Sequence, residues 1–86
     1  MDNRGYMSRI IRANLEASTD SPGVMLGRFC IAKEIPVKDV SEFFKVSRMT
    51  IYKWFVGEWI PRKQHALKIQ ETLERAKFSL SSGGAS

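Results

Sequence analysis

The residues of this chain best suited to binding another molecule lie in one short stretch, residues 46–54, with the sequence VSRMTIYKW. Arg48, Thr50 and Lys53 carry hydrogen-bond donors that suit phosphate oxygens and the edges of nucleic-acid bases. Ser47 is a typical N-cap, so a helix is predicted to begin at Arg48. Its buried face would carry Ile51, and the basic and polar side chains would then face a polyanionic partner.

Size and composition limit the domain to which such a helix can belong. The chain has 86 residues and a formal net charge of +5, which allows one small domain and favours a nucleic acid as partner. It holds one Cys and one His, and its carboxylates are scattered over helix faces. With no nucleophile beside a base and no metal-ligand set, we expect no enzyme, no cofactor, no metal and no small-molecule substrate.

The same composition sets the expected location. Cys30 cannot pair within the chain, which fits a reducing compartment. No run approaches the roughly 18–20 apolar residues of a membrane span, and residues 1–11 lack the apolar core of a signal peptide. We therefore expect a cytoplasmic protein, in a prokaryotic or phage-infected cell, with no membrane partner.

Apolar periodicity and helix-stop signals predict an all-α fold, a compact four-helix domain, or five helices with an N-terminal one. Residues 1–21 are interpreted as an arm with a short helix over 8–17, in which Leu15 shares the apolar side. Residues 22–78 form the domain, and residues 79–86 (SLSSGGAS) have the composition of a flexible tail. The four helices of the domain are predicted over 22–33, 37–44, 48–56 and from Pro61 or Arg62 to about Phe78.

The joint between the second and third of these helices is short. Only Lys45 and Val46 separate helix 37–44 from the N-cap at Ser47, which forces the two helices to cross steeply. Gly57 is predicted to end helix 48–56 in a left-handed conformation. The side chains expected in the core around this joint are Phe43, Phe44, Ile51 and Trp54.

The spaced pattern V-S-x-x-T-I-x-x-W-x-x-G-x-x-x-P, from Val46 to Pro61, resembles the lambda-repressor-like (Cro or Xre-type) helix-turn-helix family. The resemblance covers about residues 22–76 and extends to short phage-encoded regulators of this type. It implies that helix 48–56 lies in the major groove of double-stranded DNA. The residues at the matching base-reading positions are Arg48, Met49, Thr50 and Lys53. The candidates for contacts to the DNA backbone are Lys38, Ser47, Tyr52, Arg62 and Lys63.

The chain departs from the family pattern at several positions. Lys45 stands where the joint usually has Gly, which costs about 1 kcal/mol if the backbone there is left-handed. Ser41 replaces a small residue inside helix 37–44, and Pro36 replaces a capping Thr or Ser. The Ser- and Gly-rich C-terminus replaces the helix that often forms the dimer. The basic residues that could add an arm along the DNA are Arg4, Arg9 and Arg12.

The expected function is sequence-specific binding of double-stranded DNA by a small prokaryotic or phage transcriptional regulator, as a homodimer on DNA. One alternative keeps the DNA contact and makes the chain a phage accessory protein for DNA packaging, replication or excision. The other is a protein-interaction module that binds and modulates a host enzyme. In that case Trp59 would be exposed for the partner instead of covering the edge of the core.

Overall fold

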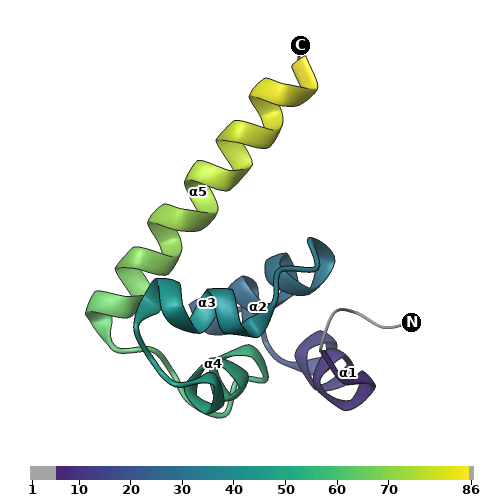
Figure 1. The fold of residues 1–86 in the computed structure, drawn as a ribbon, viewed down its shortest axis with the longest axis vertical. Coiled ribbons are helices and arrows are strands. Elements are labelled where there is room, and N and C mark those ends of the chain that lie inside the picture. Colours follow the sequence, from purple (N-terminus) through teal and green to yellow (C-terminus); the bar gives the residue numbers. More distant parts are fainter. Residues whose placement is uncertain (1–5, 86) are drawn as a thin grey trace.

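The computed structural model describes residues 6–85, and the side chains of residues 6–76, as an all-helical fold with no β-strand in this part of the chain. The expected all-α class is therefore confirmed. Four helices form one body, and the distal half of the fifth projects from it (Figure 1). The helices are α1 (Ser8–Glu16), α2 (Pro22–Ala32), α3 (Val37–Phe44), α4 (Arg48–Phe55) and α5 (Lys63–Ala85).

The core forms where α2 meets α4 and α5, with α3 packed on α4. Phe44, Ile51 and Trp54 are buried there, as predicted. The prediction for Phe43 is wrong, because 53% of this residue is exposed. Phe43 lies about 100° from Phe44 around the helix. The positions of α3 that face the core are those of Val40 and Phe44. Its ring instead packs edge-on against the Phe44 ring, with centroids 5.0 Å apart.

The segment predicted as an arm packs into the body from Tyr6 onward. Tyr6 is buried, and its hydroxyl donates to the Ile35 carbonyl at 2.7 Å. In α1 the buried side chain is Asn14, whereas Leu15, predicted on the inner side, is 63% exposed. The Asn14 amide donates to the Phe55 carbonyl at 2.7 Å and to the Val24 carbonyl at 3.1 Å. These bonds give a buried polar side chain its partners and tie α1 to α2 and to the end of α4.

Three successive helices end with a residue in the left-handed conformation. The predicted left-handed residues Lys45 (φ 59°) and Gly57 (φ 82°) are confirmed, and Glu34 (φ 57°) is a third that the sequence pattern did not indicate. After Lys45, the Val46 amide donates back to the Ser41 carbonyl at 3.0 Å. The chain therefore turns sharply between α3 and α4, with Ser47 as the N-cap of the next helix.

The remaining helix ends differ little from those predicted, except at the C-terminus. The structure ends α2 at Ala32 and α4 at Phe55, each one residue early, which is within the ordinary variation of helix ends. It extends α5 to Ala85, whereas the sequence pattern ends this helix near Phe78. The segment expected to be a flexible tail thus coincides with the last turns of α5, apart from Ser86, which lies outside the described residues. None of the helices described is both long enough and apolar enough to cross a membrane.

Candidate functional site

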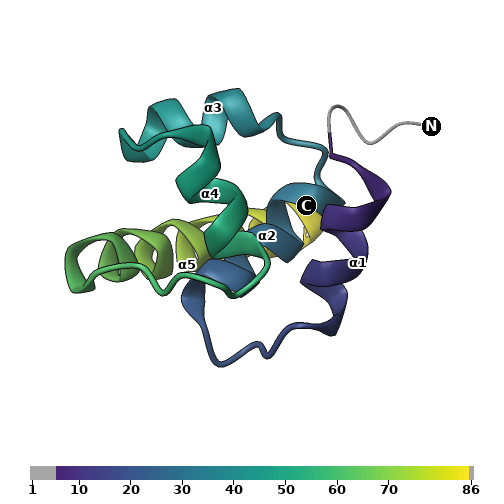
Figure 2. The ribbon, with the colours of Figure 1, turned by 90° about the horizontal axis from the view of Figure 1, so that it is seen from below.

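The candidate site is the outer face of α4, at the end of the body away from the projecting part of α5 (Figure 1). Seen from below, α4 lies between α3, α1 and the first turns of α5 (Figure 2). Its N-cap is formed as predicted, because the Ser47 hydroxyl oxygen accepts the Thr50 amide at 3.1 Å. The two hydroxyl oxygens also lie 3.0 Å apart, so one hydroxyl donates to the other. This capping fixes the first turn of α4, from which the candidate base-reading residues project.

The buried and exposed positions of α4 separate cleanly around the helix. Ile51 and Phe55 face the core, and Met49 on the opposite side is 62% exposed. Arg48 is exposed in the first turn, and its guanidinium forms no hydrogen bond or ion pair with the side chains and backbone that the structure describes. The first amide groups of a helix also lack acceptors within the helix, which favours negative charge near this end. The outer face therefore offers a free guanidinium beside a helix N-terminus.

Tyr52 lies at the border of this face. It is half-buried, and its ring meets the ring of Tyr6 edge-on with centroids 6.4 Å apart. The Tyr6 ring also packs on Phe55, at 5.9 Å between centroids. The position of Tyr52 thus depends on the N-terminal segment, which the sequence pattern predicts to be an arm outside the domain.

Lys53 has partners that the sequence analysis missed. Its ammonium lies 2.6 Å from a carboxylate oxygen of Glu58 and 5.9 Å from the centre of the Trp59 ring. Trp59 itself is 47% exposed, which favours the interpretation of this ring as available to a partner. The signal for the ion pair was the glycine at 57. In a helix end of this kind the residue after the left-handed Gly57 lies over the last turn, and the Glu58 amide does donate to the Lys53 carbonyl at 3.0 Å.

The other predicted backbone-contacting residues lie on neighbouring elements. Lys38 is exposed in the first turn of α3, Arg62 is exposed just before α5, and Lys63 is exposed as the first residue of that helix. The side chains of these three residues form no hydrogen bond or ion pair within the described part of the chain. They are free cations near two helix starts, but the structure does not join them to the outer face of α4.

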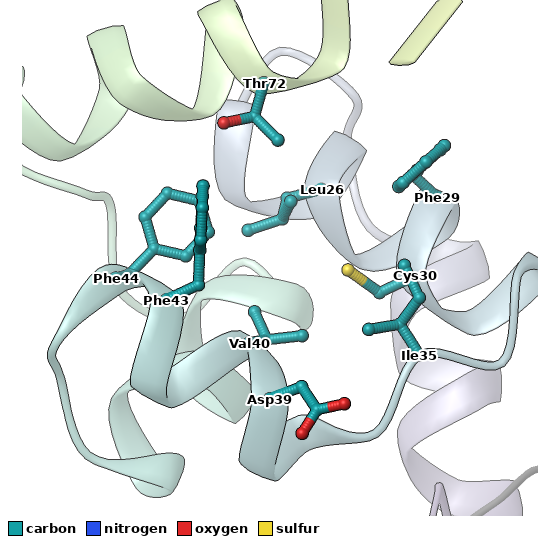
Figure 3. Close-up of a pocket in the computed structure, with 9 residues that line it drawn as sticks. All are labelled: Leu26, Phe29, Cys30, Ile35, Asp39, Val40, Phe43, Phe44 and Thr72. Atoms are coloured by element: carbon teal, nitrogen blue, oxygen red, sulfur yellow. The ribbon is translucent and has the colours of Figure 1, made fainter. Parts of the chain in front are cut away.

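A second feature of the surface is an apolar hollow of about 270 Å³ between α2, α3 and α5 (Figure 3). Phe29, Cys30, Val40 and Phe43 line it, and Asp39 carries the only charge of the lining. Burial raises the pKa of the Cys30 thiol to about 12, so the sulfur stays protonated at neutral pH and is a poor nucleophile or metal ligand. None of the predicted site residues lines this hollow, which therefore holds no part of the charged face.

No group of His, Cys, Asp or Glu within the described residues is arranged to hold a metal ion. Comparison of the chain with protein-family models, with curated proteins and with solved structures gives no match. The functional assignment accordingly depends on the residues of α3, α4 and the adjoining loop and on their geometry.

Proposed function

We propose that this chain is a sequence-specific double-stranded DNA-binding protein of the helix-turn-helix type, acting as a small prokaryotic or phage transcriptional regulator. The observation that carries the proposal is the outer face of α4. Two short helices are joined by the sharp turn at Lys45, and the second begins at a formed cap with Arg48 exposed and unpaired within the described chain. Positive charge, exposure to solvent and a helix N-terminus thus coincide on the outer face of α4.

The major groove of DNA has the dimensions needed to accept α4. The major groove of B-DNA is about 12 Å wide and admits one α-helix, whose N-terminal residues reach the base edges first. Arg48 can donate two hydrogen bonds to guanine O6 and N7, and Met49 can pack on a thymine methyl group. Thr50, whose hydroxyl lies near that of Ser47, can bind either a base edge or a phosphate. Lys53 can donate to guanine or phosphate from the next turn.

Contacts to the DNA backbone would then fix the orientation of α4. The exposed cations Lys38, Arg62 and Lys63 are the candidates, with Ser47 and the hydroxyl of Tyr52 as uncharged donors nearer the helix. A single module of this size covers little DNA surface, so tight binding calls for a homodimer on half-sites about one helical turn apart.

The test compares two charge-removing variants by fluorescence anisotropy with labelled duplexes over a range of salt concentrations. Arg48→Ala should lose about 1–3 kcal/mol of discrimination between the preferred duplex and one altered at a single base pair. Lys63→Ala should weaken binding to all duplexes alike. It should also make the affinity less steeply dependent on salt concentration, by the amount that one phosphate contact contributes. Arg75→Ala removes the same charge from an exposed position in the second half of α5 and serves as the matched control. Equal behaviour of Arg48→Ala and the control would refute a base-reading role for Arg48.

One observation favours the second candidate, a protein-interaction module. Trp59 and Ile60 are both exposed in the loop directly after α4, where aromatic and aliphatic side chains suit a protein partner. The same titration separates the two functions. Absence of duplex binding at low salt by the unaltered protein would remove the DNA proposal and leave the protein partner.

A further inference from the structure

Glu58 is an acidic group placed beside the basic face of α4, and the backbone holds it there. The Gly57 amide donates to the Trp54 carbonyl at 3.1 Å, and the Glu58 and Trp59 amides both donate to the Lys53 carbonyl, at 3.0 and 3.2 Å. This paired pattern around a left-handed glycine fixes the residue that follows it over the last turn of the helix. The carboxylate of Glu58 then meets the Lys53 ammonium at 2.6 Å. The helix end thus brings the Lys53 and Glu58 side chains together in an ion pair that stays partly exposed to solvent.

The pair has consequences for what Lys53 can bind. A phosphate offers only acceptors and a negative charge, so the Glu58 carboxylate repels it and competes with it for the same ammonium. The major-groove edge of a G·C base pair is different. Guanine presents the acceptors N7 and O6, and beside them cytosine presents the N4 amino group as a donor. A paired lysine and glutamate can therefore both bond to this edge, the ammonium to a guanine acceptor and the carboxylate to the cytosine amino group.

We propose that Glu58 is a specificity-determining residue that reads one G·C base pair together with Lys53. On that base pair the Lys53 ammonium donates to guanine and the Glu58 carboxylate accepts from the cytosine amino group. At non-specific sequences the carboxylate keeps Lys53 from neutralising a phosphate, so Glu58 lowers the affinity for wrong sites. This inference rests on the proposed DNA-binding function and assigns a specific base pair to two residues of the α4 end.

The variant that tests it is Glu58→Gln, with Glu74→Gln as matched control. Both substitutions remove one negative charge from an exposed position, and Glu74 lies on α5. An exposed ion pair contributes little to folding, so both variants are expected to fold, which far-ultraviolet circular dichroism checks. The duplexes are the sequence selected by the unaltered protein, the same sequence with each G·C pair replaced in turn by A·T, and an unrelated duplex.

For Glu58→Gln, the preference for G·C over A·T at one position should fall about tenfold. Its affinity for the unrelated duplex should rise, and the logarithm of affinity should depend more steeply on the logarithm of salt concentration by about 0.9, because Lys53 now neutralises a phosphate. Glu74→Gln should raise affinity slightly for all duplexes and leave the preference unchanged. Identical behaviour of the two variants would overturn the role of Glu58 while leaving the proposed function intact.

A double-variant cycle tests whether the two residues act as a pair. Lys53→Gln should lose preference at the same base pair as Glu58→Gln, and the double variant should lose no more than the more severe single variant. Additive losses, or losses at two different base pairs, would overturn joint reading. If the unaltered protein binds no duplex at all, the proposed function fails, and the role of Glu58 fails with it.

Discussion

Replacing Asn14 by alanine should destabilise the protein more than any single truncation on the outer side of α1. Asn14 is 1% exposed, and its side-chain amide donates to the carbonyls of Phe55 at 2.7 Å and of Val24 at 3.1 Å. The Phe55 carbonyl lies at the end of α4, where helical carbonyls lack a partner within the helix. Asn14 thus gives a hydrogen-bond donor to the last carbonyl of α4, the helix that carries the candidate site.

The magnitude follows from these contacts. The bond to the Val24 carbonyl contributes about 1 kcal/mol, and the Phe55 carbonyl, left buried without a donor, costs about 1–3 kcal/mol. The expected loss in the free energy of unfolding is therefore about 2–4 kcal/mol. A domain of this length has a total free energy of unfolding of about 4–13 kcal/mol, so the loss is a large fraction of it. It corresponds to a fall in Tm of about 8–30 °C.

The assay is urea denaturation followed by tryptophan fluorescence and by circular dichroism, since Trp54 is buried in the core. The matched control is Leu15→Ala, at the next position of α1, where the side chain is 63% exposed. That variant should change the free energy of unfolding by no more than about 0.5 kcal/mol. If Leu15→Ala proves the more destabilising of the two, α1 packs with its apolar stripe inward and the Asn14 account is refuted.

Three further substitutions or conditions test other parts of the fold. Gly27→Ala should lower the free energy of unfolding by about 1–3 kcal/mol, because a Cβ there would lie 2.6 Å from the Asn14 side-chain nitrogen; a neutral effect would show that the contact relaxes freely. Lys45→Gly should raise it by about 1 kcal/mol, because φ is 59° at this position, whereas Glu42→Gly inside α3 should lower it; the same sign for both would contradict the left-handed turn. Burial raises the pKa of Cys30 from 9.0 to about 12, so the unfolded chain releases this proton first as pH rises. The free energy of unfolding should therefore fall between these values by up to about 1.4 kcal/mol per pH unit, less steeply in Cys30→Ala, and equal slopes would disprove the assignment.

The helices around the candidate site were predictable because their signals are local. Pro22 after Ser21 and the apolar stripe of α3 mark helix starts and faces within a few residues of sequence. The predicted segment 37–44 coincides with α3, and the cap at Ser47 forms as expected. The left-handed turn at Lys45 was also predictable, but only from the resemblance to the helix-turn-helix family, which usually has Gly at this position.

What escaped the sequence analysis depends on contacts between distant residues. Asn14 and Phe55 are separated by 41 positions. Nothing in the sequence of α1 alone indicates that the side chain of Asn14, and not that of Leu15, faces the core. Phe43 is apolar like the buried residues of α3, but its side chain lines the open hollow between α2, α3 and α5 instead of the core. Its ring lies exposed with the Lys68 ammonium 4.5 Å above it.

The ion pair at the end of α4 is a different case, because its signal in the sequence is local. Gly57 was correctly predicted to end the helix in a left-handed conformation. The same motif places the following residue over the last turn, so the proximity of Glu58 to Lys53 could have been derived from the sequence.

The most direct test of the DNA-binding proposal is selection of bound sequences from a random duplex library by the purified protein at about 150 mM salt. We predict an enriched motif that contains at least one strongly preferred G·C base pair, in two half-sites about 10 base pairs apart related by two-fold symmetry. Recovery of sequences indistinguishable from the starting library, under conditions in which the protein is folded, would contradict sequence-specific recognition by the face of α4.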